Sequence, residues 1–418
     1  MELINISDYE YYDYNKKKKC INNYFNKILF YLFLFLLEIF IFPNTNHLPK
    51  NVMNRNEIKN YIKYISDCKN HKKYNRIKII NKNPYISVCI PALNMEKYIE
   101  NAILSIINQS YQDFEIIIVN DNSNDDTEKY IKKLQLEDNR IKLINHNISK
   151  GVYYSRLEAI LFAKGKYILL MDPDDLYLNE NLFKELYNNN LKYNLDITEF
   201  TVFQKIESRR KIFYPKKHFE SHFHNFTDVF IFQPNLSEIL FRIPNNNKYT
   251  YSICRNIWNK IIRREIFLKM HEFIGLDYFN DFVITADDMA MNLIIYHFAN
   301  NYSNIYLPGY MYNIRQVSMS HGDGGDRLKQ IRAINYLLYF KIIFKYIRKF
   351  KISRNILFHE LRNLRRFIYF IKDYNMTIYE NLTKIFLNEI LNDNFADKIF
   401  KSFVVELLLY FEKEDFNI

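Results

Sequence analysis

The chain has 418 residues, of which 48% are hydrophobic and 25% are charged. This composition is ordinary for a globular protein and excludes a chain that is disordered throughout. The length predicts one catalytic domain with appendages, or two domains that share an interface. The net charge of +11 is compatible with a phosphate-rich or anionic-membrane partner. A bias towards AT-rich codons would give the same excess of Lys without any partner, and the abundance of Asn, Ile, Tyr and Phe is typical of such a bias. The four cysteines are scattered and predict neither a zinc site nor a disulfide framework.

The N-terminus has the pattern of a membrane signal anchor. The basic cluster Lys16–Lys19 precedes an almost wholly apolar run, Ile28–Phe42, that only Glu38 interrupts. Because these fifteen residues span about 22 Å as a helix, less than the roughly 30 Å hydrocarbon core, we extend the span backwards. We expect a cytosolic basic tail over residues 1–23 and a transmembrane anchor over 24–43, with the catalytic part across the membrane, in the ER or Golgi lumen of a eukaryote. A cleaved signal peptide and a monotopic or buried helix are the alternatives.

A polar, basic stem over residues 44–83 separates this anchor from a region of alternating strands and helices. The predicted strands and helices alternate in the order Tyr85–Ile90, Met95–Asn108, Phe114–Val119, Asp126–Leu136, Ile141–Asn145, Tyr153–Ala163 and Tyr167–Met171. Strands that are apolar along their whole length indicate a parallel sheet covered on both faces. The alternation therefore predicts a doubly wound α/β sheet, whose ligands bind beyond the carboxyl ends of the strands. Asn94, Asp121 and the cluster Asp172–Asp175 lie at such ends.

Several sequence blocks occur here in the order of a known family. The blocks are Ile86–Asn94, Ser105–Ser110, Phe114–Asp125, the single residues Gly151, Arg156, Ala163, Gly165 and Tyr167, then Asp172-Pro173-Asp174-Asp175, Trp258-Asn259-Lys260 and Asp287-Asp288. Over residues 84–320 the chain resembles the family 2 glycosyltransferases of GT-A fold. The resemblance implies a Rossmann-like, doubly wound mixed sheet. It also implies an inverting transfer of a hexosyl or N-acetylhexosaminyl group from a nucleotide-diphosphate donor, UDP by family tendency, to a hydroxyl of a glycan, lipid or protein. No nucleic-acid partner is expected.

The resemblance also implies a metal and donor site. Mn²⁺ or Mg²⁺ takes oxygen ligands and stabilises the charge that grows on a leaving diphosphate. Asp174 corresponds to the family's metal ligand, Asp172 to a second ligand or a ribose contact, and Asp175 to either. An acidic helix start is the alternative for this cluster. The expected nucleotide-sugar contacts are Pro91, Asn94, Asp121, Arg156, Asp172, Asp174 and Arg315.

Three of these residues have expected roles of their own. Asp121 would accept a hydrogen bond from the imide N–H of uracil, with a turn-forming role as the alternative. Arg156 would pair with a phosphate or with a structural carboxylate. Arg315 begins a segment, Arg315–His321, that resembles the one that closes on the diphosphate in this family.

An inverting transfer needs a general base that takes the proton of the acceptor hydroxyl. The resemblance implies Asp288 for this role, beside Asp287 and at the start of a helix predicted over Met289–Ala299. Helix capping is the alternative role of this acidic pair.

Residues 321–418 are interpreted as a glycine-rich hinge followed by accessory helices. Three of the seven glycines of the chain lie between residues 322 and 325, which favours a mobile lid or a flexible linker. The helical period from Arg327 to Ile418 includes a basic stretch near Lys345 to Arg366, and these helices would cover the catalytic domain, lie on a membrane or bind acceptor.

Two other classes of protein remain open from the sequence. A catalytically weak or inactive, membrane-anchored nucleotide-sugar binding protein would keep the same fold. A nucleotidyltransferase would also use acidic metal ligands, but the chain lacks a Gly-rich or basic phosphate loop near Pro91.

Overall fold

The computed structural model describes most of the chain beyond residue 81. The described ranges are 82–206, 211–213, 229–232, 244–245, 248–249, 256–275, 287–315, 325–350 and 377–392, with single positions between 364 and 408. The predicted basic tail, membrane anchor and all but the end of the stem lie outside these ranges and stay predictions. No helix in the described part of the chain is both long and apolar enough to cross a membrane.

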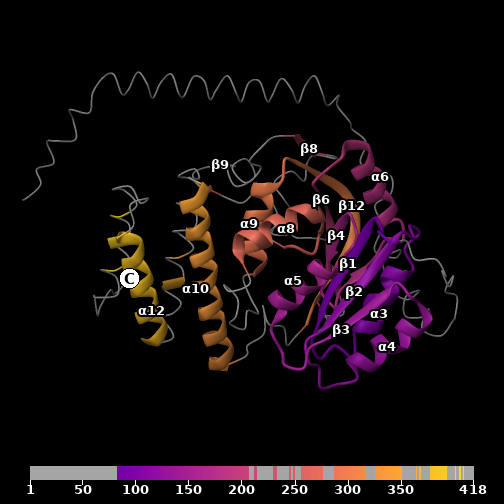
Figure 1. Ribbon diagram of the computed structural model, residues 1–418, viewed down its shortest axis with the longest axis horizontal. Helices are drawn as coiled ribbons and strands as arrows, with labels where there is room; N and C mark the ends of the chain where they lie inside the picture. Colours follow the sequence, from indigo (N-terminus) through magenta and orange to yellow (C-terminus); the bar gives the residue numbers. More distant parts are fainter. Residues whose placement is uncertain are drawn as a thin grey trace, which may run out of the picture. The chain divides into compact units, whose positions relative to one another are not determined.

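A mixed sheet forms the centre of the described structure (Figure 1). Its first half consists of four parallel strands in the order β3-β2-β1-β4, namely β1 (Ile86–Ala92), β2 (Phe114–Asn120), β3 (Ile141–Asn145) and β4 (Tyr167–Leu170). The second half continues in the order β11-β6-β12-β5, with β11 (Lys260–Arg263), β6 (Ile197–Ile206), β12 (Asn301–Ile314) and β5 (Leu176–Tyr177). Because β11 runs antiparallel to both β4 and β6, the sheet is mixed, as the family resemblance implies.

Four short strands complete the described β-structure. β7 (Lys211–Phe213) pairs with β6 and β8 (Val229–Phe232) pairs with β12, whereas β9 (Pro244–Asn245) and β10 (Lys248–Tyr249) form a small separate sheet.

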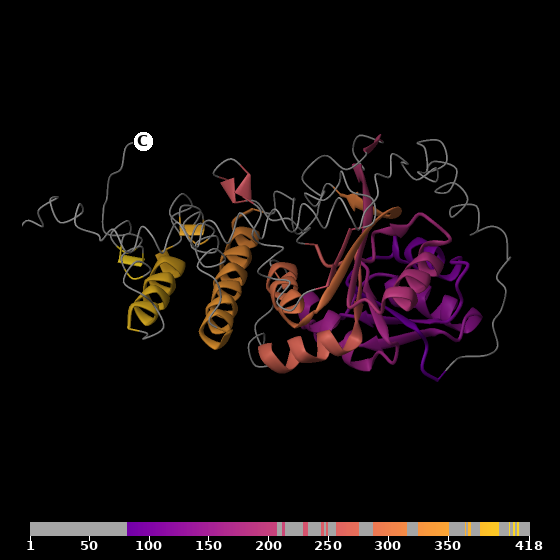
Figure 2. The ribbon, with the colours of Figure 1, turned by 90° about the horizontal axis from the view of Figure 1, so that it is seen from above.

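Helices cover both faces of the main sheet (Figures 1 and 2). The helices α3 (Ile99–Ile107), α4 (Thr127–Glu137) and α6 (Leu182–Tyr193) cover one face, and α5 (Val152–Phe162), α8 (Arg264–Ile274) and α9 (Asp287–Phe298) cover the other. Side chains of β1 alternate between the two cores: Val88 and Ile90 pack beside α3, and Cys89 packs towards α5. The predicted doubly wound arrangement is therefore confirmed.

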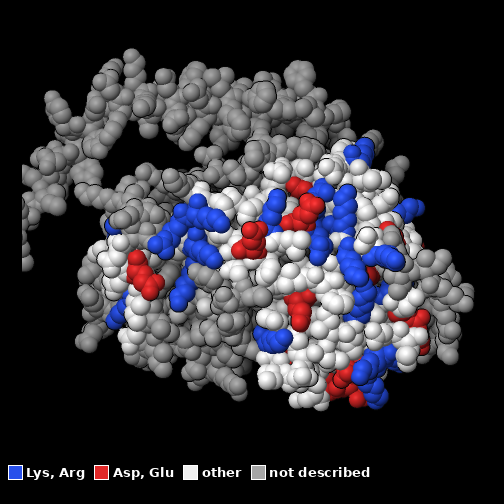
Figure 3. Space-filling model, viewed as in Figure 1, with Lys and Arg blue, Asp and Glu red and all other residues white. Residues whose placement is uncertain are grey.

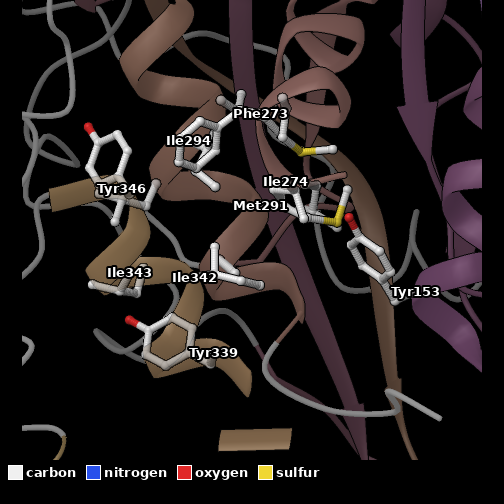
Figure 4. Close-up of a cluster of buried hydrophobic side chains, with 14 of the residues drawn as sticks. Tyr153, Phe273, Ile274, Met291, Ile294, Tyr339, Ile342, Ile343 and Tyr346 are labelled. Atoms are coloured by element: carbon white, nitrogen blue, oxygen red, sulfur yellow. The ribbon is translucent and has the colours of Figure 1, made fainter. Parts of the chain in front are cut away.

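The second core extends beyond the α/β domain into α10 (Gly325–Phe350). Ile342 and Tyr346 of this helix pack in one cluster with Ile294 of α9 and Phe273 of α8 (Figure 4). Burial of each large apolar side chain stabilises the folded state by about 1.5–3 kcal/mol. Of the predicted accessory helices, α10 thus covers the catalytic domain, and α12 (Thr377–Leu391) contributes Leu387 to the same cluster.

The first helix begins four residues later than the sequence predicts, at Ile99 instead of Met95. Asn94 has a φ of 54°, which is incompatible with a helix, and its N–H donates to the Ser123 hydroxyl at 3.0 Å. The N–H of Met95 donates to the Thr127 hydroxyl at 2.7 Å. The loop after β1 is therefore held to the loop after β2 by side-chain acceptors, which a local helical pattern does not reveal.

Gly165 provides a test of the packing between β1 and the turn before β4. A Cβ atom there would lie 2.5 Å from Ser87 Oγ and 2.6 Å from Ser87 N. We expect Gly165→Ala to lower the free energy of unfolding by about 1–3 kcal/mol, because backbone must shift to admit the methyl group. Denaturant unfolding checks this. The neighbouring exposed Lys164→Ala is the control, and equal stability of the two variants would contradict the packing.

Candidate active site

Arg156 joins two of the predicted site carboxylates at the carboxyl edge of the sheet. This α5 side chain, only 7% exposed, places Nη2 2.7 Å from Oδ1 of Asp172 and Nη1 2.8 Å from Oδ1 of Asp288. Asp172 follows β4, and Asp288 lies in the first turn of α9. Of the two roles that the sequence left open for Arg156, the structure shows the pairing with carboxylates.

Arg315 is the second arginine of this edge. Its Nε lies 2.5 Å from Oδ2 of Asp174, and its guanidinium carbon lies 5.4 Å from the ring centre of Tyr98, which precedes α3. Burial raises the pKa of Asp174 to about 6, although Arg315 acts in the opposite direction. The residues that follow Arg315 in the expected closing segment, 316–321, lie outside the described residues.

Asp175 connects the acidic turn to strand β12. It is fully buried, its Oδ2 accepts a hydrogen bond from the Tyr310 hydroxyl at 2.6 Å, and its Oδ1 accepts one from the N–H of Asn313 at 2.7 Å. Burial raises the pKa of Asp175 well above its usual range. These contacts with β12 give Asp175 a structural role, whereas the sequence left metal or ribose binding open.

The block Trp258-Asn259-Lys260 supports the same turn through β12. The Trp258 ring is stacked with the rings of Tyr310 and Tyr312, at centroid distances of 4.9 Å and 5.1 Å. Nζ of Lys260 donates to Oδ1 of Asn259 at 2.7 Å and is buried 3.7 Å from Oε2 of Glu199. Tyr310 therefore contacts this block through the Trp258 ring and the acidic turn through its hydrogen bond to Asp175.

Asp121 is enclosed by the loop between β3 and α5. Its carboxylate accepts four hydrogen bonds, from the ring of His146 (2.6 Å), the Ser149 hydroxyl (2.6 Å) and the N–H groups of Lys150 (2.7 Å) and Gly151 (2.9 Å). Burial alone would raise the pKa of Asp121, but the hydrogen bonds, that from Lys150 foremost, outweigh it and lower the pKa. A carboxylate has about four acceptor positions, so a uracil imide would have to displace one of these donors.

His146 is a residue of this edge that sequence reasoning missed. Its Nδ1 faces Asp121, and its Nε2 is in hydrogen-bond contact with Oε2 of Glu158 on α5. The signal that could have found it is positional, because His146 directly follows β3 at the carboxyl end of that strand.

Pro91 and Asn94 lie at the same end of β1. Pro91 is buried within the strand opposite Val119, whereas Asn94 is exposed and its Oδ1 accepts a hydrogen bond from the N–H of Asn124 at 2.9 Å. All seven predicted donor-site residues are described: Arg156 lies on α5, and the other six belong to strand ends and to the loops that follow them. Whether each contacts a nucleotide-sugar stays a prediction.

Asp172 and Asp174 are the residues that could hold a divalent metal. The ion pairs with Arg156 and Arg315 engage one oxygen of each carboxylate, and a carboxylate can coordinate through its other oxygen. No group of three or more His, Cys, Asp or Glu side chains within the described ranges forms a metal cage. Two carboxylates suit Mg²⁺ or Mn²⁺ that completes its coordination with substrate phosphate and water, so the residues fit such an ion.

The fold and this edge define the class of the domain. A doubly wound α/β sheet with acidic side chains beyond its parallel strands is a nucleotide-binding arrangement. Residues 87–269 match the family model described as "Glycosyl transferase family 2". This region of the chain therefore matches the family that the sequence blocks resemble.

Curated relatives cover parts of the same region. Glycosyltransferase GlyG of Streptococcus pneumoniae is 26% identical over 186 residues, 44% of this chain and 59% of that protein. The UDP-Glc:alpha-D-GlcNAc-diphosphoundecaprenol beta-1,3-glucosyltransferase WfgD of Escherichia coli is 31% identical over 111 residues, 26% of this chain and 43% of that protein. The chain thus spans less than two thirds of these relatives. Among solved structures, S. aureus TarS 1-349 in complex with UDP-GlcNAc aligns over 68% of this chain and 81% of that chain. The TM-score is 0.44 and the sequence identity is 19%, so this similarity carries no functional argument.

The buried Asp121 carboxylate predicts a pH-dependent stability difference. Asp121→Asn leaves one acceptor oxygen for four donors, so we expect a lower melting temperature at pH 7. Since the folded-state pKa is lowered, the carboxylate stabilises the fold above its unfolded pKa of about 3.9, and this contribution is lost as the pH falls through the folded pKa. The gap between wild type and variant should therefore close below about pH 4.

Thermal melts from neutral to acidic pH measure this gap. Glu180→Gln, at an exposed carboxylate, is the control and should follow the wild type at every pH. A gap for Asp121→Asn that does not change with pH would contradict the role of the charge.

Proposed function

We propose that the protein is an inverting, metal-dependent glycosyltransferase that moves a hexosyl or N-acetylhexosaminyl group from a UDP-sugar to an acceptor hydroxyl. The observation that carries this proposal is the pairing of Arg156 with both Asp172 and Asp288. One side chain thereby joins the acid expected at the donor diphosphate to the acid expected at the acceptor. The match of residues 87–269 to the family model supports the same reaction.

On the donor side, Asp172 and Asp174 would hold Mn²⁺ or Mg²⁺. When bound, this ion supplies positive charge to the diphosphate as the glycosidic bond breaks. Arg315 is a second source of positive charge beside Asp174 and would pair with the leaving diphosphate. Asp121 would orient the nucleotide base at the other end of the edge.

On the acceptor side, Asp288 would take the proton of the attacking hydroxyl. Its carboxylate is ion-paired with Arg156 through Oδ1, and its other oxygen would accept this proton. A single displacement by that hydroxyl, on the face opposite the leaving diphosphate, inverts the anomeric carbon.

Relatives suggest the chemical class of the acceptor. WfgD, by its name, acts on a diphosphoundecaprenol-linked sugar, as does the GalNAc(5)-diNAcBac-PP-undecaprenol beta-1,3-glucosyltransferase of Campylobacter jejuni, which is 38% identical over 97 residues. We therefore propose a lipid-linked glycan as acceptor ahead of a free glycan or a protein.

Release of UDP from a panel of UDP-sugars tests the reaction. We expect release to require Mn²⁺ or Mg²⁺, and Asp174→Asn to reduce it by at least about a hundredfold, because the amide cannot supply a charged ligand oxygen. The same metal should raise the melting temperature of the wild type with its cognate donor, but not that of the variant. Donor binding without any turnover would indicate an inactive binding protein. Release of pyrophosphate from UTP and a sugar 1-phosphate, in a parallel assay, would indicate a nucleotidyltransferase.

Asp288→Asn separates catalysis from binding. The amide cannot accept the acceptor proton, so the turnover number should fall by roughly 10²–10⁴-fold. Stabilisation by the UDP-sugar in a thermal-shift assay should persist. Glu265→Gln, at an exposed carboxylate of α8, is the control, and full activity of Asp288→Asn would exclude Asp288 as the base.

A further inference from the structure

The positive charge of the chain lies outside its catalytic domain. Residues 84–325 have a net charge of −3 and residues 367–418 one of −4, whereas residues 326–366 contain twelve Lys and Arg against two acidic residues. The remaining excess of +8 lies in residues 1–83. A Lys-rich composition of the whole chain does not explain this segregation, because it would make the flanking segments basic as well.

From residue 335 to residue 350, α10 presents its cations on one side. Lys341, Lys345, Arg348 and Lys349 recur at helical spacing, within about 100° of arc and about 12 Å along the axis. Lys345 is half-buried and the other three are exposed. Figure 3 shows Lys and Arg side chains gathered over the upper part of this helix. We name these four residues the basic face of α10.

The core fixes the direction of the basic face. Ile343, Tyr346 and Ile347 of the same turns are buried against α8 and α9. Nζ of Lys345 donates to the Ile274 carbonyl at 3.4 Å, and the ammonium groups of Lys345 and Lys349 lie 5.3 Å and 5.4 Å from the ring centre of Phe273. The face is therefore packed beside α8, with the apolar side of α10 turned towards the core.

The exposed lysines of α4 differ from those of α10 in that carboxylates lie beside them. Lys129, Lys132 and Lys133 are exposed, as Lys341 and Lys349 of α10 are, but each lies beside a carboxylate, at 2.8 Å from Asp126, 2.6 Å from Glu128 and 3.2 Å from Glu100. In α10 the acid Asp326 lies fifteen residues before Lys341, and residues 335–350 contain no Asp or Glu.

We propose that the basic face of α10 is a docking surface for an anionic lipid bilayer. Because the apolar side of α10 is buried in the core, the attraction is electrostatic and needs no insertion into the lipid. Phe344 and Tyr346 are buried, so neither ring is available among the cations to stack on a nucleic-acid base.

The position of the face suits a transferase that acts at a membrane. His297, near the end of α9, contacts Phe350 of α10 with ring centroids 4.0 Å apart. His297 lies nine positions after Asp288 on α9, which is about 14 Å along the helix. Docking would thus bring the bilayer surface near the side of the proposed base. Only this last step rests on the proposed function, since docking itself requires no catalysis.

Vesicle co-sedimentation of the full chain tests the docking surface. Wild type is compared on phosphatidylcholine vesicles and on vesicles with about one third phosphatidylglycerol. The variant Lys341→Gln/Arg348→Gln/Lys349→Gln should bind the anionic vesicles on the order of a hundredfold more weakly, at about fivefold per cation. Salt near 1 M, which reduces the screening length to about 3 Å, should remove the wild-type preference. Binding through residues 1–83, which include the apolar run and carry an excess of +8, is the same in wild type and variant, so the difference between the two proteins reports on α10 alone.

The matched control is Lys129→Gln/Lys132→Gln/Lys133→Gln on α4, which should bind as the wild type does. Both triple variants should keep the wild-type melting temperature and UDP release from a soluble donor. Equal affinity of wild type for the two kinds of vesicle, or equal binding by wild type and the α10 variant, would overturn the proposal. Loss of binding to a duplex oligonucleotide without loss of vesicle binding would also overturn it and assign the face to nucleic acid.

Discussion

Compensation of half-buried negative charge by Arg156 is the interaction on which the arrangement of this edge depends. Carboxylates that approach each other out of water repel, and their burial is costly unless they are paired. The guanidinium of Arg156 has several donors in a fixed plane and can hold two separate carboxylates, which a lysine cannot do as well. It joins Asp172 to Asp288, 116 residues later in the sequence. The donor end and the acceptor end of the proposed site thus share one cation.

Helix α5 extends this coupling to the base end of the site. Two residues after Arg156, Glu158 is in contact with His146, whose other ring nitrogen bonds to Asp121. A buried network of this kind is stable only when its members are all satisfied. The carboxylate after β2 and the carboxylate after β4 are therefore positioned by the same helix, and a shift of α5 would move both.

The C-terminal part belongs to the same unit through its core and differs from it in charge. Apolar side chains of α10 join those of α8 and α9 in one cluster, while Lys341, Arg348 and Lys349 of α10 are exposed at its edge. The sequence left three roles for these helices. The packing makes α10 a cover of the catalytic domain, and it fixes the direction in which its charges point.

The sequence by itself determined the parallel half of the sheet and the residues at its edge. Strands β1 to β4 and helices α4 and α5 lie within two residues of their predicted bounds, because buried strands and amphipathic helices have local periodicity. Strand ends then identified Asp121, Asp172 and Asp174. Only the tertiary structure decided which partners these residues have, for example His146 beside Asp121 and Tyr310 beside the buried Asp175. Such pairs join distant segments, and their geometry depends on packing and side-chain direction, which no local pattern encodes.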